Sequence, residues 1–358
     1  MAASPSKLSE LALSEERTAR WLLVPTFVIL FCLAIYPLGR VFYLSFTNKR
    51  FASDQAVEMV GFQNYRDLLS VTVRELPKKL DENGQPILKD GKPEYELWTR
   101  VLPREPRRYR AAWEFDFFGK RYVIGATNAD FIRSVWDTIV FTIIAVALET
   151  ILGLMIALAL ARRFFGRGAM RTAMLIPWAI ITVVSSLIWE WMFKSDRSGL
   201  FTMLLNRLGF IEDSGQITWL VNPALQLPSA IAIDVWKTTP FMALLLLAGL
   251  STIPKELYEA ANVDGASRIR QFFSLTLPLL MPTLSVALIF RTLDSLRVFD
   301  LFQIVFGENR YSMATFTQFA LVAQRDMGLS SAVSVIIFII LFAFAIFYMR
   351  TFRVEIDD

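Results

Sequence analysis

Charged side chains inside strongly apolar segments are the residues with the clearest chemical meaning in this sequence. Six of them, in three separate apolar runs, are Glu149, Asp234, Lys237, Arg291, Asp294 and Arg297. A charge in hydrocarbon is costly, so such a residue either serves a function or is neutralised by a partner. Residues three apart can meet on one helix face, so Asp234 and Lys237 could form an internal pair, as could members of the group at 291–297. For Glu149, a functional role and a hydrogen-bonded packing role both stay open.

Enzymatic chemistry has few candidate residues in this chain. The sequence contains no histidine, and its single cysteine, Cys32, lies in an apolar run. These counts exclude histidine-based catalysis, histidine or cysteine-rich metal sites and disulfides. The two Gly-Lys pairs, at 91–92 and 119–120, lack the following Ser or Thr that a nucleotide-binding P-loop uses for Mg²⁺. We therefore expect a chain that is not an enzyme, with no catalytic residue, no metal site and no cofactor of its own.

The composition is that of a polytopic membrane protein. Apolar residues make up 54% of the 358 residues, the mean hydropathy is +0.45, and phenylalanine alone occurs 30 times. This is too apolar for a water-soluble protein of this length. The net charge of +4 does not indicate nucleic-acid binding, because the basic residues flank apolar runs, as the positive-inside rule describes.

Six membrane spans are predicted from apolar runs of sufficient length. They cover residues 21–44, 135–160, 173–193, 228–250, 279–302 and 332–349, with Pro177 expected to kink the third span and Pro240 expected to break the fourth. Gly153, Ala157 and Ala161 recur every four residues in the second span, a spacing that lets another helix approach closely. A loop with four arginines and no acid, residues 161–171, marks the cytoplasmic side, so both termini are expected there.

The domain organisation follows from these spans. Residues 1–20 form a polar tail, 21–44 the first span, 45–133 an extracytoplasmic insert, 134–350 a core with five spans, and 351–358 a second tail. The insert is expected to contain a small folded part, because residues 114–123 are typical of a hairpin turning at Gly119-Lys120. Residues 303–330 are expected to form an outer loop.

A polar segment at residues 254–282 separates the fourth and fifth spans. Residues 256–264 predict a short helix, Gly265 can adopt the backbone angles of a turn, and residues 267–276 predict a second helix. Pro278 and Pro282 are expected to mark the start of the next membrane helix. From composition alone, a protruding helix–turn–helix and an amphipathic linker lying in the membrane interface are both open.

The same segment resembles the EAA loop of ABC importer permeases. Glu259-Ala260-Ala261, Gly265 four residues after Ala261, and Leu277-Pro278 match that signature, although Leu275 stands at its isoleucine position. The form Asp264-Gly265-Ala266 is similar to that of the maltose and trehalose permeases. Residues 236–240 and 297–300 are similar to the same family, and the resemblance covers about residues 134–349. It implies an all-α polytopic membrane protein with the six-helix type I ABC importer core and a small insert after the first helix.

The resemblance also implies a function and a set of partners. The chain would be the permease subunit of an ATP-driven importer of a sugar, such as a di- or oligosaccharide or a glucoside, in a bacterial inner membrane. Its partners would be a second homologous permease subunit, an extracytoplasmic sugar-binding protein and two ATPase subunits, which use ATP and Mg²⁺. The residues implied in ATPase coupling are Glu259, Ala260, Ala261, Asp264, Gly265, Leu277 and Pro278.

The substrate path is implied by position within the fourth and fifth spans. Relatives line a cavity there, and aromatic faces with dense hydrogen-bonding groups suit a sugar. The residues at these positions are Asp234, Trp236, Lys237, Thr238, Thr239, Phe241, Asp294, Ser295 and Arg297. Gly307-Glu308-Asn309 departs from the Gly-Gly-Pro of many relatives.

Three alternatives belong to other classes. The first is an ABC permease for a non-sugar solute such as a polyamine or a phosphonate. The second is an ion-driven secondary transporter, which would show internal repeats and would have no use for a cytoplasmic helix–turn–helix. The third is a membrane scaffold or insertase, which intramembrane charges on several helices disfavour.

Overall fold

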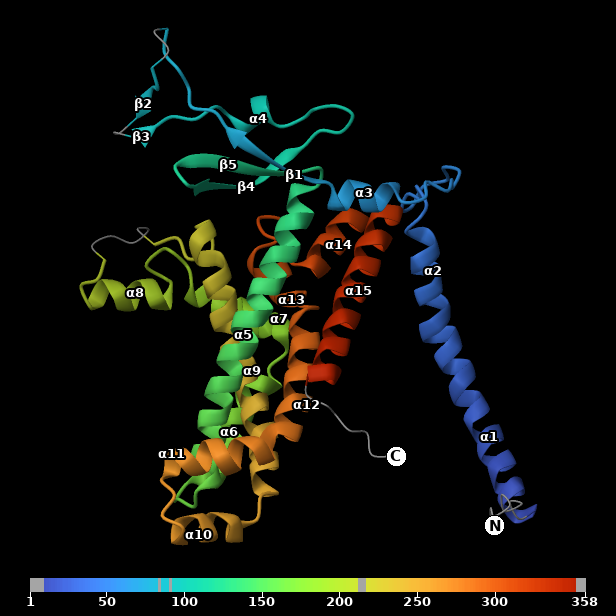
Figure 1. Cartoon of the computed structure of the whole chain (residues 1–358), viewed down its shortest axis with the longest axis vertical. Helices are drawn as coiled ribbons and strands as arrows, with labels where there is room; N and C mark the ends of the chain where they lie inside the picture. The colour runs from blue at the N-terminus through green and yellow to red at the C-terminus, as the bar shows by residue number, and fades with distance from the viewer. Residues whose placement is uncertain (1–9, 83–84, 90–91, 212–216, 352–358) are drawn as a thin grey trace, which may run out of the picture. The chain divides into compact units, whose positions relative to one another are not determined.

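The computed structural model describes residues 10–82, 85–89, 92–211 and 217–351, so the ends of the predicted tails lie outside it. Five helices are long and apolar enough to cross a membrane, and a bent helix pair supplies a sixth candidate span (Figure 1). This helical architecture agrees with the predicted fold class. The chain divides into two compact units, residues 1–65 with 320–335, and residues 66–319 with 336–358.

The first unit is built around the end of the first span. Helix α1 (Glu10–Leu30), the π-helix η1 (Phe31–Ile35) and α2 (Tyr36–Leu44) run on without a break, so the predicted tail is already helical from Glu10. The side-chain amide of Asn64 donates to the carbonyl oxygens of Ser45 and Thr47, at 2.8 and 2.9 Å. The N–H of Gly328, at the start of α15 (Met327–Thr351), donates to the carbonyl of Lys49 at 3.0 Å. These bonds satisfy backbone groups that follow the helix end.

Proline follows each π-helix of the described chain. Pro37 comes two residues after η1, and Pro278 comes two residues after η2 (Phe272–Thr276). Proline has no N–H and its ring crowds the carbonyl four residues earlier. A π turn, in which the N–H of residue i bonds to the carbonyl of residue i−5, accommodates that defect without ending the helix.

The insert in the second unit contains a three-stranded antiparallel sheet. Strands β1 (Val71–Leu76), β5 (Lys120–Ala126) and β4 (Arg110–Phe117) are arranged in the order β1-β5-β4. The predicted hairpin is present, but its turn residues are Phe118 and Gly119, one position earlier than expected, because Phe117 pairs with Lys120. The insert also holds β2 (Leu88–Lys89), β3 (Lys92–Pro93), α3 (Gln63–Leu69) and α4 (Trp98–Val101).

Three long helices form the centre of the second unit. They are α5 (Ala129–Ala161), α9 (Pro223–Ser251) and α12 (Leu277–Ser295), which pack against one another (Figure 1). A methyl group on Gly153 of α5 would lie 2.8 Å from Cγ of Met242 and 3.1 Å from the backbone nitrogen of Ala243, so glycine permits the close contact with α9. Ala157 is fully buried one turn later, whereas Ala161 is exposed, so the small-residue contact ends before Ala161.

The third predicted span is two helices rather than one kinked helix. Helices α6 (Arg167–Ala179) and α7 (Thr182–Met192) are bent by 91° relative to each other. The break lies at Ile180 and Ile181, whose ψ angles of 130° and 135° are extended, and Pro177 lies within α6. The predicted kink at Pro177 is therefore misplaced, because the bend lies three and four residues later, at Ile180 and Ile181. Helix α8 (Leu200–Arg207) follows in the next connection.

Helix α9 continues through Pro228 and Pro240, so the predicted break at Pro240 is also wrong. A proline inside a helix leaves the carbonyl four residues earlier, here that of Trp236, without its usual partner. Packing against α5, α6 and α12 supports the helix across this defect.

The fifth and sixth predicted spans have different bounds in the structure. Helix α12 ends at Ser295, and the separate α13 (Asp300–Val305) follows. The predicted outer loop at 303–330 contains α14 (Met313–Val322), and α15 begins at Met327, five residues before the predicted start. Short helices of six and ten residues were missed because their apolar runs are below spanning length.

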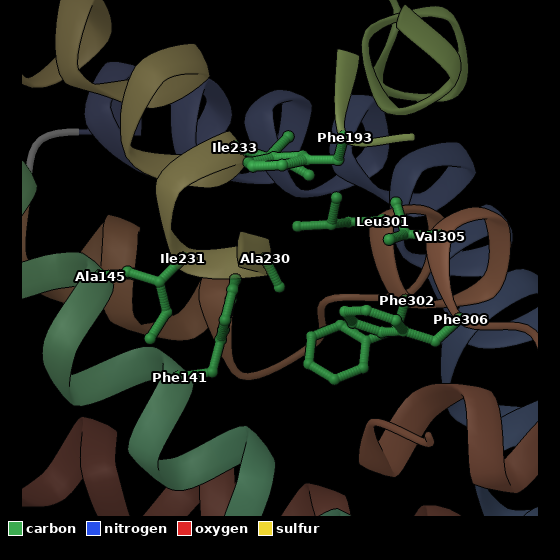
Figure 2. Close-up of a cluster of buried hydrophobic side chains, with 10 residues drawn as sticks. All are labelled: Phe141, Ala145, Phe193, Ala230, Ile231, Ile233, Leu301, Phe302, Val305 and Phe306. Carbon is green, nitrogen blue, oxygen red and sulfur yellow. The ribbon is translucent and has the colours of Figure 1, made fainter. Parts of the chain in front are cut away.

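A buried aromatic and aliphatic cluster holds α5, α9 and α13 together (Figure 2). The rings of Phe141 and Phe302 meet edge to face with centroids 5.4 Å apart. The cluster consists of Phe141, Ala145, Phe193, Ala230, Ile231, Ile233, Leu301, Phe302, Val305 and Phe306.

Candidate coupling elbow and intramembrane charge cluster

The elbow, residues 254–276, consists of two helices joined by a tight turn. Helix α10 (Lys255–Val263) ends before Gly265, whose φ of 72° lies in the left-handed region that favours glycine. Ser267 then caps α11 (Arg268–Gln271) by accepting a hydrogen bond from the N–H of Arg270. The segment therefore has the local structure of a helix–turn–helix.

Two side-chain contacts hold the elbow helices together. The side-chain amide of Gln271 donates to Oδ1 of Asn262 at 2.7 Å and to the carbonyl of Ala266 at 2.9 Å. The hydroxyls of Tyr258 and Thr276 lie 3.0 Å apart. These residues were not predicted from the sequence, although polar residues on the apolar side of two short helices are a signal for such contacts.

The predicted coupling residues occupy three places. Glu259, Ala260 and Asp264 are exposed on α10 and its end, while Ala261 is half-buried. Leu277 and Pro278 lie inside a continuous helix, because α11, η2 and α12 run on from Arg268 to Ser295 (Figure 1). Pro278 lies in the first turn of α12, as predicted, whereas Pro282 lies inside that helix. The π-helix η2 joins α11 to α12 with no non-helical residue between them. The second arm of the elbow and the membrane helix α12 are one element.

Arg291 is the centre of the charge cluster, which comprises Glu149, Asp234, Thr238, Arg291 and Asp294. Its Nε lies 2.5 Å from Oε2 of Glu149, its Nη2 lies 3.0 Å from Oε1 of the same carboxylate, and its Nη1 lies 2.7 Å from Oδ2 of Asp294. Asp234 binds Nη2 as well, and Thr238 donates to Oε1 of Glu149 at 2.5 Å. Arg291 and Glu149 are buried. One guanidinium therefore joins carboxylates from α5, α9 and α12.

The cluster pairs the charges differently from the sequence prediction. The internal pair of Arg291 with Asp294 is present. Asp234, however, is paired with Arg291 on another helix, and Lys237 has no carboxylate within 4.0 Å among the described residues. The planar guanidinium of Arg291 has several donors in a fixed arrangement and binds three carboxylates at once. The ammonium of Lys237 is a compact point charge without this fork of donors. For Glu149, the hydrogen-bonded packing interpretation describes its contacts.

The remaining predicted path residues are distributed along α9 and the end of α12. The ring of Trp236 lies edge to face with Trp189 at 5.4 Å, and Phe241 stacks on Trp178 at 5.7 Å. The hydroxyls of Thr239 and Ser295 are buried without a hydrogen-bond partner in the described chain. Arg297 is exposed beyond the end of α12. The structure thus joins Thr238, Asp234 and Asp294 in one cluster and leaves the others in separate contacts.

A second ion pair fastens the α13–α14 connection to the helix bundle. Arg310 makes two 2.7 Å hydrogen bonds to the carboxylate of Asp137 and one of 2.9 Å to the carbonyl of Pro223. Beside it, burial and two neighbouring carboxylates raise the pKa of Tyr311 to about 12. Neither Asp137, Arg310 nor Tyr311 was predicted as a functional residue. Asp137, a carboxylate near the start of an apolar run, was the available signal.

Comparison with known families decides what this arrangement is. Residues 149–353, more than half of the chain, match the family described as binding-protein-dependent transport system inner membrane component. The chain belongs to this family. It is an ABC transporter permease, a membrane subunit of a transport system, as the elbow signature predicted.

Curated relatives of the permease extend over most of its length. It is 43% identical to the trehalose/maltose transport system permease protein MalF of Thermococcus litoralis, over 68% of this chain and 82% of the relative. It is 31% identical to the sulfoquinovosyl glycerol transport system permease protein SmoG of Agrobacterium fabrum, over 96% and 93% of the two chains. Identity to the trehalose transport system permease protein SugA of Mycobacterium tuberculosis is 30%, over 95% and 90%.

Solved structures share the fold of the permease. A chain of a bacterial ABC transporter involved in the import of the acidic polysaccharide alginate is similar with a TM-score of 0.68 at 18% identity, covering 97% of this chain and 99% of that one. A chain of a bacterial alginate ABC transporter in complex with an alginate-bound periplasmic protein gives 0.56 at 22% identity, covering 62% and 77%. At these identities the likeness concerns the fold, and it confirms the predicted class.

Proposed function

We propose that this permease moves a sugar across the cytoplasmic membrane as part of an ATP-driven importer. This proposal is supported by its relatives, which are named as permeases for trehalose and maltose, sulfoquinovosyl glycerol, and trehalose. A di- or oligosaccharide or a glucoside is the cargo class, delivered by an extracytoplasmic binding protein. Both termini and the elbow are cytoplasmic, and the insert lies outside, in line with the four arginines at residues 162–171.

The elbow couples the permease to an ATPase subunit, and the observation that carries this role is its continuity with α12. Two large apolar side chains on the elbow, Val263 and Ile269, are 88% and 73% exposed and suit burial against a partner. Glu259 is exposed nearby and can pair with a basic residue of that partner. Because Arg268 to Ser295 is one helix, a displacement of the elbow displaces α12 and its Arg291. The permease itself contributes no ATP chemistry, and a second permease subunit and two ATPase subunits complete the transporter.

The cargo path runs beside the charge cluster. The carboxylates of Asp234 and Asp294 are each paired with Arg291, and their side chains remain 13% and 69% exposed, respectively. Trp236 and Lys237 lie one turn or less from Asp234 on α9. Carboxylates that are oriented by Arg291 but still accessible can accept hydrogen bonds from sugar hydroxyls, and an exposed indole face can pack on a sugar ring.

Transport by the assembled importer in proteoliposomes tests this function. The transporter is purified with its ATPase and second permease subunits, reconstituted, and supplied with its binding protein. Uptake of labelled trehalose and maltose is measured with and without enclosed ATP, and with an ionophore. We expect uptake that requires ATP and survives the ionophore.

Two results would contradict the proposal. Uptake that collapses with the ionophore and continues without ATP would indicate an ion-driven transporter. Uptake of a labelled polyamine such as spermidine with no uptake of either sugar would indicate a non-sugar ABC permease. The variant Glu259→Lys is the coupling control: it should insert and assemble, yet lose ATP-dependent uptake, because it places like charges at the contact.

A further inference from the structure

The connection between α5 and α6 carries an unusual surplus of positive charge. Arg162 and Arg163 lie directly after α5, and Arg167 and Arg171 lie one turn apart at the start of α6. No acidic residue occurs in the sequence between Glu149 and Glu190. Among the described residues, none of these four arginines has a carboxylate within 4.0 Å.

Two of these arginines are incompletely satisfied within the chain. Arg167 and Arg171 are half-buried and face the same side of α6, since they are four residues apart. The Nε of each is buried without a hydrogen-bond partner in the described residues. A guanidinium in this state favours an oxyanion ligand, because charge-assisted hydrogen bonds to carboxylate or phosphate are its strongest interactions.

Exposed phenylalanines accompany the arginines. Phe165 is fully exposed and Phe164 is 45% exposed, both in the short turn between the helices. Gly166, with φ of 84°, directly precedes α6, and no side chain caps that helix start. Aromatic side chains next to arginines are typical of segments that insert apolar groups below a layer of lipid headgroups.

The position of this turn relative to the bilayer follows from α5. That helix has 33 residues and qualifies as a membrane span, and it ends at Ala161. The turn at 162–166 therefore lies at the membrane surface opposite to the insert, where the headgroups are. An arginine there meets phosphate, and a phenylalanine meets the upper part of the acyl chains.

We propose that this turn, with Arg167 and Arg171, is a binding site for an anionic phospholipid headgroup. The guanidinium groups of Arg167 and Arg171 hold the phosphate, Arg162 and Arg163 strengthen the local positive potential, and Phe164 and Phe165 pack on the acyl chains. An acidic surface of another protein could also bind these arginines. We favour a phospholipid, because the bilayer that α5 spans already places headgroups at this turn. The proposal does not depend on the nature of the cargo.

Lipid retention by the assembled transporter tests the site. The complete transporter is purified in detergent, titrated with phosphatidylglycerol, and its bound lipids are counted by native mass spectrometry. We expect the double variant Arg167→Gln/Arg171→Gln to bind phosphatidylglycerol about 25-fold more weakly, at about fivefold for each arginine. Binding of phosphatidylcholine should not change.

The matched control removes the same charge elsewhere. Arg197→Gln/Arg207→Gln alters two exposed arginines around α8 and should leave phosphatidylglycerol binding unchanged. If the first double variant fails to assemble, the exposed pair Arg162→Gln/Arg163→Gln gives a milder loss in the same direction, and Phe165→Ala weakens retention without changing charge.

Two outcomes would overturn the proposal. Equal phosphatidylglycerol binding by the arginine variants and the parent would show that the site holds no lipid. Release of the ATPase subunits from the variants, with lipid binding retained, would show that the arginines contact protein. Sugar uptake is not part of the readout, so failure here and failure of the proposed transport function are distinguishable.

Discussion

Arg291 on α12 and Glu149 on α5, 142 positions apart in the sequence, share two hydrogen bonds of 2.5 and 3.0 Å in the interior of the helix bundle. The pair does not stand alone, because Asp234 on α9 and Asp294 also bind the same guanidinium. The three central helices are therefore joined through a single side chain. Any motion of α12 relative to α5 and α9 has to keep these bonds or exchange them.

The first prediction concerns this arginine. Replacing Arg291 with Met removes the only cation that pairs with Glu149 and Asp234 in the described chain, and leaves these two carboxylates without a counter-charge. We expect a loss of about 3–5 kcal/mol in the free energy of unfolding. Thermal unfolding of the detergent-solubilised protein measures it.

The conservative control is Glu149→Gln. Its amide oxygen still accepts from Arg291 and Thr238, so we expect a smaller loss than for Arg291→Met. If the two variants unfold at the same temperature as the parent, the cluster does not stabilise the bundle.

The second prediction concerns Gly328 at the start of α15. A methyl group at this position would lie 2.0 Å from the carbonyl oxygen of Thr47, which is backbone and cannot rotate away. Gly328→Ala should destabilise the protein by about 1–3 kcal/mol. Gly39→Ala is the matched control, because nothing lies within 4 Å of its methyl and alanine favours a helix by about 0.5–1 kcal/mol. Limited proteolysis distinguishes the two variants, because Gly328→Ala should be cleaved faster than Gly39→Ala. Equal resistance of both variants to the protease would contradict the close contact between Gly328 and the carbonyl of Thr47.

The third prediction concerns Gly265 in the elbow. No atom lies within 4 Å of a methyl group there, so a substitution acts through backbone strain rather than a clash. Gly265→Val should oppose the left-handed turn by about 1–2 kcal/mol, whereas Gly265→Asn should be tolerated better. We expect the valine variant to hydrolyse ATP in the assembled transporter with reduced sugar uptake, and the asparagine variant to approach the parent. Equal uptake by both variants would show that the turn geometry does not matter for coupling.

The fourth prediction compares two ion pairs. The pair of Arg310 with Asp137 retains only 17% and 10% side-chain exposure, and removing Arg310 leaves a nearly buried carboxylate. Arg310→Ala should therefore lower the free energy of unfolding by about 3 kcal/mol or more. Lys120 and Glu75, in the sheet, form an exposed pair, so Lys120→Ala should cost much less than Arg310→Ala. Chemical denaturation measures both, and a larger cost for Lys120→Ala would contradict the comparison.

Local sequence determined the membrane spans and the elbow. An apolar run of spanning length favours a helix in the bilayer, so five of the six predicted spans contain one long helix, whereas the third is a bent helix pair. The elbow is formed by features that lie close together in the sequence: a short helix, Gly265 with φ of 72°, and the helix cap Ser267. It was predicted because each of these features depends on local sequence. The hairpin turn at Phe118-Gly119 was misplaced by one residue because its register is set by pairing between strands.

Only the tertiary structure decided how the helices bend, continue and pair. Pro240 did not break α9 because packing against neighbouring helices supports it, and η2 carried the elbow helix through Pro278. Spacing along the sequence favoured Lys237 as the partner of Asp234, yet Arg291 from another helix took that place. A short-range pattern specifies the residues that can meet on one helix, whereas the choice of partner depends on which helix faces lie together, a property of the whole bundle.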